Sequence, residues 1–285
     1  MSHDFRERVH ARYDDLSGAQ RRIAEFILAN SNRAAFMTAA RIGRVVGVSE
    51  STVVRFATAL GYPGYRSLQR ALQEGVRAQL TAAERLELAE DAEDDPAAVL
   101  ERVLRADIDN IRATLHDLQP ETFRRALTVI EQADRVFVVG QRSAAAVSHY
   151  LTFYLMFLRP RVIPLGDAST IFERLVDLGP RDALVAVSFP RYSRLTYDVF
   201  KLARSRRAAT VAITDSVVSP MARIADVTLA AHTTLVSFAD SLVAPLSLTN
   251  ALITALALRR REEAQQSLKA LEQIWDQYSI YLLEE

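Results

Sequence analysis

A short loop in the second half of the chain combines hydroxyl groups with an arginine and a tyrosine. The segment SFPRYSRLT, residues 188–196, follows the apolar run DALVAVS. A guanidinium can form paired hydrogen bonds with a phosphate or a carboxylate, and a tyrosine ring can stack on a sugar. We therefore expect a small anionic ligand to contact Ser188, Arg191, Tyr192, Ser193 and Thr196. The alternative is that Ser193 only caps a helix and that Arg191 is a solvated surface residue.

A second candidate contact is the turn formed by Gly140, Gln141, Arg142 and Ser143, which follows the apolar run RVFVV. A glycine turn that leads into a helix presents free N–H groups and the positive end of the helix dipole, and both suit an anion. Because every parallel α/β sheet contains such turns, this pattern is weak by itself. His232, at the end of another apolar run, is a further candidate for the same pocket.

The residues around the loop do not favour catalysis. Isomerisation of a sugar phosphate needs a positioned base, but the loop is followed by Leu195, Thr196 and Tyr197. Asp198 comes next, and helix capping explains it equally well. The chain has five histidines, no cysteine, and no spacing typical of a catalytic triad or a metal site. We expect a binding protein that is not an enzyme and needs no cofactor, with a sugar-phosphate isomerase as the alternative.

A different chemistry is indicated by AARIGRVVGVSESTVVRFAT, residues 39–58. Its apolar and small residues form one inward face across two short helices, at Ile42, Gly43, Val46, Val48, Val53 and Phe56. Gly47 suits a sharp turn and Ser49 the N-cap of the second helix. Ser49, Glu50, Ser51, Thr52 and Arg55 then face outward, as in a recognition helix that enters the major groove of double-stranded DNA. An ordinary helical hairpin is the alternative.

Charge is distributed unevenly around this motif. Residues 33–77 contain seven arginines, Arg41 among them, against two glutamates, whereas residues 81–95 contain seven acidic residues against one arginine. The whole chain is neutral, with 35 basic and 35 acidic residues, so only the local cluster indicates contact with phosphates. Tyr62 and Tyr65 are most simply core residues, although a tyrosine hydroxyl can also reach a phosphate.

Five apolar runs follow: RVFVVG, RVIPLG, DALVAVS, ATVAIT and DVTLAA. They are separated by helix-length segments at Ser143–Phe157, Ile171–Leu178, Ser193–Ser205 and Pro220–Ile224. This alternation predicts a doubly wound, five-stranded parallel sheet whose ligands bind outside the C-terminal strand ends. We expect an all-α helix-turn-helix domain at residues 1–80, an acidic linker and connecting helix at 81–122, and an α/β domain at 123–285. A final helix carrying Leu268, Leu271, Ile274, Trp275 and Tyr278 is expected to pack or to form oligomer contacts.

The sequence gives no sign of a membrane protein. No signal peptide is visible, and the most apolar helical segment, Leu242–Leu258, is too short and too polar to span a bilayer. We expect a cytoplasmic protein.

The segment VSESTVVRFATALGYPGYRSL, followed by the five apolar runs, resembles the RpiR family of bacterial transcriptional regulators. The resemblance implies a C-terminal sugar isomerase (SIS) domain, DNA binding through residues 38–60 beginning at Thr38, and a homodimer or homotetramer. It also implies an effector in the SIS domain, which in this family is often a phosphorylated sugar. Two recognition helices about 34 Å apart would match successive major grooves.

The chain departs from the family at the expected effector loop. The usual SIS phosphate loop reads Ser-x-Ser-Gly-x-Thr; here Ser188 and Ser193 occupy its first and last places, and Pro190-Arg191 replaces its Ser-Gly. Proline removes a hydroxyl and an N–H, whereas arginine adds a charge. Gln141-Arg142 likewise replaces a smaller turn. We expect an effector-responsive regulator that holds its anion through arginine, with a sugar phosphate or another sugar derivative as the ligand.

Overall fold

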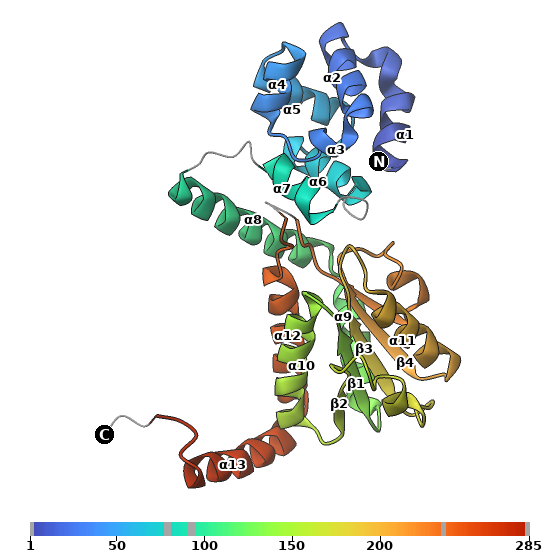
Figure 1. The fold of residues 1–285 in the computed structure, drawn as a ribbon, viewed down its shortest axis with the longest axis vertical. Helices are drawn as coiled ribbons and strands as arrows, with labels where there is room; N and C mark the ends of the chain where they lie inside the picture. The colour runs from blue at the N-terminus through green and yellow to red at the C-terminus, as the bar shows by residue number, and fades with distance from the viewer. Residues whose placement is uncertain (1–2, 77–80, 90–94, 235–237, 283–285) are drawn as a thin grey trace. The chain divides into compact units, whose positions relative to one another are not determined.

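The computed structural model describes residues 3–76, 81–89, 95–234 and 238–282, which fall into two compact units (Figure 1). The helical unit comprises Met1–Ala106 and Thr234–Asp240, and the sheet unit comprises Asp107–Thr233 and Ser241–Glu285. The chain therefore passes between the two units three times, first inside helix α8 (Pro96–Asp117) and later on each side of Thr234–Asp240.

The helical unit is built from short helices around one apolar core that includes Phe5, Ile23, Ile42 and Phe56. At the start of α2, the Ser17 hydroxyl accepts from Gln20 N–H while the Gln20 side chain accepts from Ser17 N–H, which is a complete capping box. The helices are α1 (His3–Arg12), α2 (Gly18–Ala29), α3 (Ser31–Ala34), α4 (Ala39–Val46), α5 (Glu50–Ala59), α6 (Tyr65–Val76) and α7 (Ala82–Ala89), with a 3-10 turn, η1 (Tyr13–Asp15), after α1.

The sheet unit contains the predicted five-stranded, all-parallel sheet, in the order β2-β1-β3-β4-β5. Every residue of β1 and β3 is buried, as expected for strands covered on both faces. The strands are β1 (Val136–Gly140), β2 (Val162–Pro164), β3 (Ala183–Val187), β4 (Ala209–Thr214) and β5 (Val227–Ala230).

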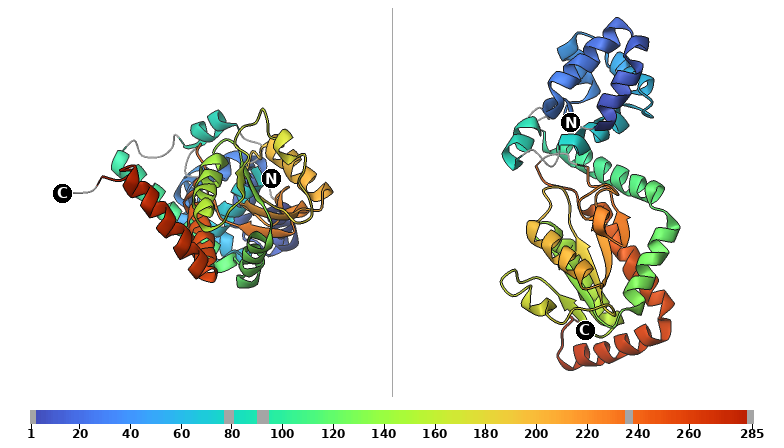
Figure 2. Two further views of the ribbon diagram at one scale, coloured as in Figure 1. Left: turned by 90° about the horizontal axis from the view of Figure 1, so that it is seen from below. Right: turned by 90° about the vertical axis from the view of Figure 1, so that its right-hand side faces the viewer.

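Helices cover both faces of this sheet (Figures 1 and 2). One face packs against α9 (Pro120–Gln132), α10 (Ala144–Leu158) and α12 (Val243–Arg259), through strand residues such as Val138 and Val185. The other face packs against α11 (Arg194–Ser205), through residues such as Phe137 and Leu184. The chain continues into α13 (Arg261–Gln277).

Two connections are shorter than the sequence suggested. The helix-length segments expected at Ile171–Leu178 and Pro220–Ile224 contain only single 3-10 turns, η2 (Glu173–Leu175) and η3 (Ala222–Ile224). Segments this short form few helical hydrogen bonds to offset the cost of nucleation, so an α-helix forms in them only where packing favours it. The turns still contribute apolar side chains, such as Leu175 and Met221, to the core on the α11 face.

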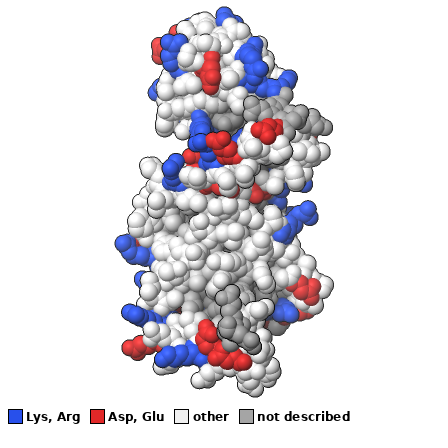
Figure 3. Space-filling model, turned by 90° about the vertical axis from the view of Figure 1, so that its left-hand side faces the viewer, with Lys and Arg blue, Asp and Glu red and all other residues white. Residues whose placement is uncertain are grey.

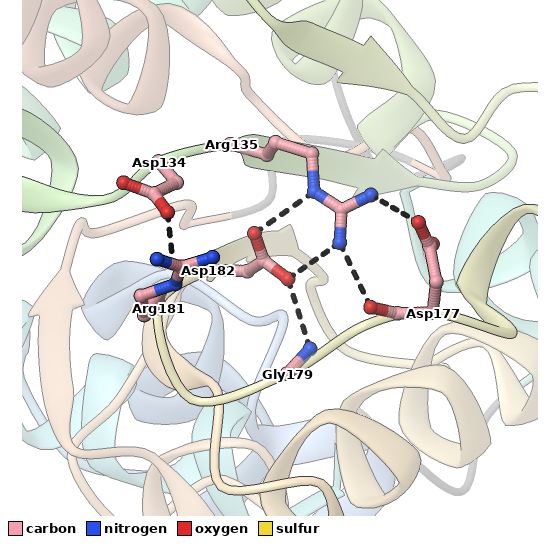
Figure 4. A network of polar contacts seen from close by, with 6 residues as sticks. All are labelled: Asp134, Arg135, Asp177, Gly179, Arg181 and Asp182. Atoms are coloured by element: carbon pink, nitrogen blue, oxygen red, sulfur yellow. Dashed lines mark hydrogen bonds and ion pairs between the residues drawn. The ribbon is translucent and has the colours of Figure 1, made fainter.

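The amino-terminal ends of β1 and β3 are joined by a network of paired charges (Figure 4). The Arg135 guanidinium donates to both carboxylate oxygens of Asp182, at 2.9 and 2.8 Å, and to the Asp177 carboxylate at 2.6 Å. Gly179 N–H also donates to Asp182. Burial alone would raise the pKa of Asp182, but the hydrogen bonds from Arg135 and Gly179 outweigh it and hold that pKa below its ordinary value. This network ties the two central strands together at the end opposite to the expected ligand site.

Candidate DNA-binding helix and effector-binding edge

Helices α4 and α5 form the predicted helix-turn-helix. Gly47 ends α4 with φ of +74°, a left-handed conformation that glycine adopts at little cost. The Ser49 hydroxyl then accepts from Thr52 N–H at 3.3 Å and caps α5. Gly43 is required for a different reason, because a Cβ there would lie 2.7 Å from the Val48 carbonyl oxygen. The turn is tight because two glycines permit it.

The front of α5 presents a compact set of hydroxyl groups. The Ser49 hydroxyl lies 2.9 Å from that of Ser51 and 2.8 Å from that of Thr52. Glu50 and Arg55 are exposed beside them, whereas Val53 and Phe56 are fully buried in the core. The five side chains expected to face outward are therefore partly or fully accessible on one short helix.

The start of α4 lies next to this surface in the motif. The Thr38 hydroxyl accepts from Arg41 N–H at 3.2 Å and caps the helix. Arg41 is partly exposed and Arg44 fully exposed. Short side chains and arginines at the ends of α4 and α5 are the groups that contact DNA phosphates in other helix-turn-helix proteins.

Tyr62 and Tyr65 have the core role instead of the phosphate-reaching role. Both side chains are buried in the helical unit. The Tyr65 hydroxyl donates to the Met37 carbonyl at 2.5 Å, and burial raises its pKa well above the ordinary value. The Tyr62 ring lies under the Arg8 guanidinium, 4.6 Å from centroid to carbon. A hydroxyl that is enclosed and bonded, as in Tyr65, is not available to DNA.

The expected effector loops meet where the strand order reverses. β1 and β3 are neighbours, and Gly140 pairs with Val187 at their carboxyl ends. β2 follows β1 on one side, whereas β4 and β5 follow β3 on the other. The connections after β1 and β3 consequently lead in opposite directions along the sheet, and such a switch point is the usual ligand position in open parallel sheets.

In the loop after β1, close packing against α10 requires glycine at position 140. A Cβ at Gly140 would lie 2.7 Å from both the Ala144 carbonyl oxygen and the Ser148 hydroxyl, so glycine lets α10 approach the strand. Arg142 follows in the left-handed conformation, with φ of +58°, and is exposed. The exposed Ser143 makes no capping bond from its side chain, while Gln141 donates to the Leu165 carbonyl at 3.4 Å.

In the loop after β3, the expected contacts divide into two groups. Ser188 and Thr196 are buried, with exposed fractions of 3% and 0%, so they support the loop from beneath. The Ser193 hydroxyl accepts from Thr196 N–H and caps α11, which is the structural alternative considered for it, yet Ser193 also remains partly exposed. Arg191 is exposed and left-handed, with φ of +64°.

Tyr192 is partly exposed, and its hydroxyl is anchored beside the next strand. Its hydroxyl donates to the Asp215 carboxylate at 2.9 Å, and Thr214, the last residue of β4, donates to the same oxygen at 3.1 Å. Sequence reasoning missed Asp215. Its signal was a polar Thr-Asp-Ser directly after the apolar run ATVAI.

His232 does not join the other expected effector residues. It follows β5, which is the edge strand and is separated from β1 by β3 and β4. Its ring Nε2 lies 2.7 Å from the Asp117 carboxylate, and its backbone N–H donates to the Thr114 hydroxyl. Burial opposes ionisation of Asp117, but hydrogen bonds from His116 and His232 keep its pKa below the ordinary value. His232 thus fastens the end of β5 to the last turns of α8.

Arg142 and Arg191 differ electrostatically from the two other left-handed arginines. Arg161 and Arg207 follow the C-terminal ends of α10 and α11, where a cation is favoured by the helix dipole and a left-handed residue is common. Arg142 and Arg191 precede the N-terminal ends of the same helices, where a cation is disfavoured. Within the described part of the chain, neither has an ion pair or side-chain hydrogen bond. A bound anion would relieve this unfavourable placement.

Comparison with known proteins places both units in families. The profile described as "Helix-turn-helix domain, rpiR family" matches residues 4–79, and the SIS domain profile matches residues 129–255. The sugar isomerase domain of an RpiR transcription factor from Sphaerobacter thermophilus is 38% identical, with a TM-score of 0.59, over 60% of this chain and 97% of that one. This chain belongs to the RpiR family.

Two further proteins match over nearly the whole length. The HTH-type transcriptional regulator HexR of Pseudomonas aeruginosa is 27% identical over 94% of each chain. The Vibrio vulnificus NanR protein, solved as a complex with ManNAc-6P, shares the fold with a TM-score of 0.59 at 21% identity, over 96% of this chain and 98% of that one. The RpiR-family chain is therefore a DNA-binding transcriptional regulator with a SIS domain. Among its described residues, no helix is long and apolar enough to cross a membrane.

Proposed function

We propose that this RpiR-family regulator binds its operator through α5 and that an anionic sugar derivative, such as a sugar phosphate, changes its operator affinity. The observation that carries the effector assignment is the position of Arg142 and Arg191. Both guanidinium groups stand at the carboxyl ends of the central strands, before helix N-termini, without partners in the described chain. The phosphorylated sugar in the NanR complex supports this ligand class.

At the DNA end, we propose that Ser49, Glu50, Ser51, Thr52 and Arg55 contact base edges and that Thr38 and Arg41 position the helix on the phosphates. A bidentate arginine contact to guanine discriminates against the wrong base by about 1–3 kcal/mol. Among the described residues, the Arg55 side chain donates only to the Thr52 hydroxyl, at 3.5 Å, so it can reorient toward a base at little cost.

We also propose that the regulator acts as a homodimer, alone or paired into a tetramer, and that a second copy covers α10 and α12. Helix α10 contains no aspartate, glutamate, lysine or arginine, and α12 contains only Arg259, its last residue. The side shown in Figure 3 is correspondingly white over much of the sheet unit, with charges at its margins. Phe153, Met156 and Leu258 are exposed at 48%, 57% and 67%. An apolar surface of this kind is typical of an interface between copies.

An isomerase is the competing function, and the loop after β3 argues against it. The carboxylate nearest to the loop on α11 is Asp198, and it accepts from Arg194 at 2.8 Å on the helix surface. A base held in an exposed ion pair is poorly placed to remove a carbon-bound proton. We therefore propose a sensing role without turnover, which would be overturned by isomerase activity on a panel of sugar phosphates.

The DNA assignment is tested by fluorescence anisotropy with a selected operator duplex at several salt concentrations. Arg55→Ala should weaken specific binding by about tenfold or more and relax the preference for the base that it contacts, at every salt concentration. Arg22→Ala is the matched control, since Arg22 is exposed on α2 outside the motif. Equal affinity of the wild-type protein and Arg55→Ala at every salt concentration would disprove the assignment.

A further inference from the structure

Asp215 is a carboxylate at the effector edge that no part of the DNA-binding or anion-binding argument uses. It follows Thr214 directly after β4, and β4 pairs with β3 through Ile213 and Val187. Asp215 therefore lies one strand away from the switch point between β1 and β3, at the same edge of the sheet. Its side chain is half-buried, and it has no ion pair within the described residues.

The two oxygens of this carboxylate are in different environments. Oδ1 accepts from the Tyr192 hydroxyl at 2.9 Å and from the Thr214 hydroxyl at 3.1 Å, and the latter lies 3.2 Å from the Ser219 hydroxyl. Oδ2 accepts no hydrogen bond from any residue in the described part of the chain. One half of the carboxylate is thus anchored by two neutral donors, and the other half is an open acceptor.

Only one oxygen of Asp215 has a structural role. At the opposite end of the sheet, the buried Asp182 and the exposed Asp226 use both oxygens and have an arginine partner. The open oxygen of Asp215 keeps access to solvent, so a ligand at this edge can reach it. A ligand that brings a neutral donor would satisfy this oxygen.

We propose that Asp215 accepts hydrogen bonds from hydroxyl groups of the effector and that Tyr192 is the residue that positions it. This inference rests on the proposed function and narrows the ligand class to anions that carry several hydroxyl groups. The anionic group lies toward Arg142 and Arg191, since a carboxylate repels it and a guanidinium attracts it. The hydroxyl groups lie toward β4. Anions of similar length without hydroxyl groups are rejected.

The size of this rejection follows from the chemistry of the acceptor. A site built to receive a ligand hydroxyl discriminates strongly against an analogue that lacks it, because the buried acceptor is then left without a partner. Losing a hydrogen bond to a charged group costs about 1.5–3 kcal/mol, which corresponds to about a 10- to 100-fold loss of affinity.

The test compares ligands with and without hydroxyl groups by isothermal titration calorimetry on the full chain. The probes are ManNAc-6P, glucose 6-phosphate and arabinose 5-phosphate, each beside hexyl phosphate. At least one sugar phosphate should bind the wild-type protein about tenfold more tightly than hexyl phosphate does. Asp215→Asn should remove this preference and leave hexyl phosphate affinity unchanged or slightly higher, because a repelling charge is lost. Tyr192→Phe, which keeps the ring, should lower only sugar-phosphate affinity, by about threefold.

Asp198→Asn is the matched control, because Asp198 is a carboxylate on the adjoining helix with its own arginine partner. It should leave all affinities unchanged. If Asp215→Asn left the preference intact, or weakened hexyl phosphate equally, the inference would be overturned and the proposed anion site would stand. If no probe bound the wild-type protein, the proposed effector class and the inference would both be wrong. Should Asp215→Asn not fold, Tyr192→Phe gives the same decision.

Discussion

The two ends of the parallel sheet use the same residue types in opposite ways. At the amino ends of the strands, Arg135 is matched by Asp182 and Asp177, and Asp226 by Arg204 and Thr210. At the carboxyl ends, Arg142 and Arg191 have no partners within the described residues, and Asp215 keeps one oxygen open. Paired charges stabilise the strands, whereas the open charges at the carboxyl ends are available to a ligand.

The left-handed arginines show that backbone conformation by itself does not mark a site. All four have φ near +60°, but Arg161 and Arg207 follow helix C-termini, where both the conformation and the charge are favourable. Arg142 and Arg191 adopt the same conformation before helix N-termini, where the charge is unfavourable. The contrast lies in the electrostatic setting, and it can be tested from both ends of the sheet.

The largest expected effect is at the paired end. Arg135→Met should destabilise the protein by about 3 kcal/mol, because it leaves the nearly buried Asp182 carboxylate without its main partner. Urea unfolding measures this change. Effector affinity of the folded protein should stay at the wild-type value in calorimetry. A large loss of affinity in this variant would contradict the assignment of the amino end to stability alone.

At the open end, Arg191→Ala should lower the affinity for a sugar phosphate by about 10- to 100-fold, through loss of charge-assisted hydrogen bonds to the anion. The free energy of unfolding should be unchanged or slightly higher. Arg207→Ala, which alters an equally exposed left-handed arginine, is the control and should bind normally. Equal ligand binding by both variants would remove Arg191 from the site.

A smaller difference is expected when glycine replaces each arginine. Arg191→Gly should stabilise the unliganded protein by about 0.5–1 kcal/mol, since it relieves both the left-handed strain and the unfavourable charge. Arg207→Gly should stabilise less, because it also removes a favourable charge at a helix C-terminus. Thermal unfolding without ligand compares the two, and the reverse order would contradict the dipole argument.

The smallest effect concerns pH. The pKa of Asp182 is lowered in the folded protein, so its contribution to stability is present above its unfolded pKa of about 4 and is lost as pH falls through the lower folded value. Asp182→Asn should therefore make the free energy of unfolding fall less steeply as the pH is lowered. The pH midpoint of acid unfolding should shift by about a few tenths of a unit. Stability that fell just as steeply in this variant below pH 4 would assign the acid limb to other carboxylates.

Local signals made the helix-turn-helix and the strands predictable. Gly47, Ser49 and the apolar spacing of α4 and α5 act over a few residues, and the buried strands read as continuous apolar runs. The site was predicted only in outline. Tyr192 contacts Asp215 because β3 pairs with β4, and His232 contacts Asp117 although 115 positions separate them in the sequence. No local sequence pattern predicts either contact.

The threefold passage of the chain between its units has a consequence for how such regulators can be recombined. Arg85 on α7, almost fully buried, pairs at 3.6 Å with Asp240, which returns to the helical unit from beyond β5. A chimera that exchanged only residues 1–106 between two relatives would join one parent's arginine to the other parent's loop. A chimera that exchanges DNA specificity should therefore take Arg85 and Asp240 from the same parent, although the two residues are 155 positions apart.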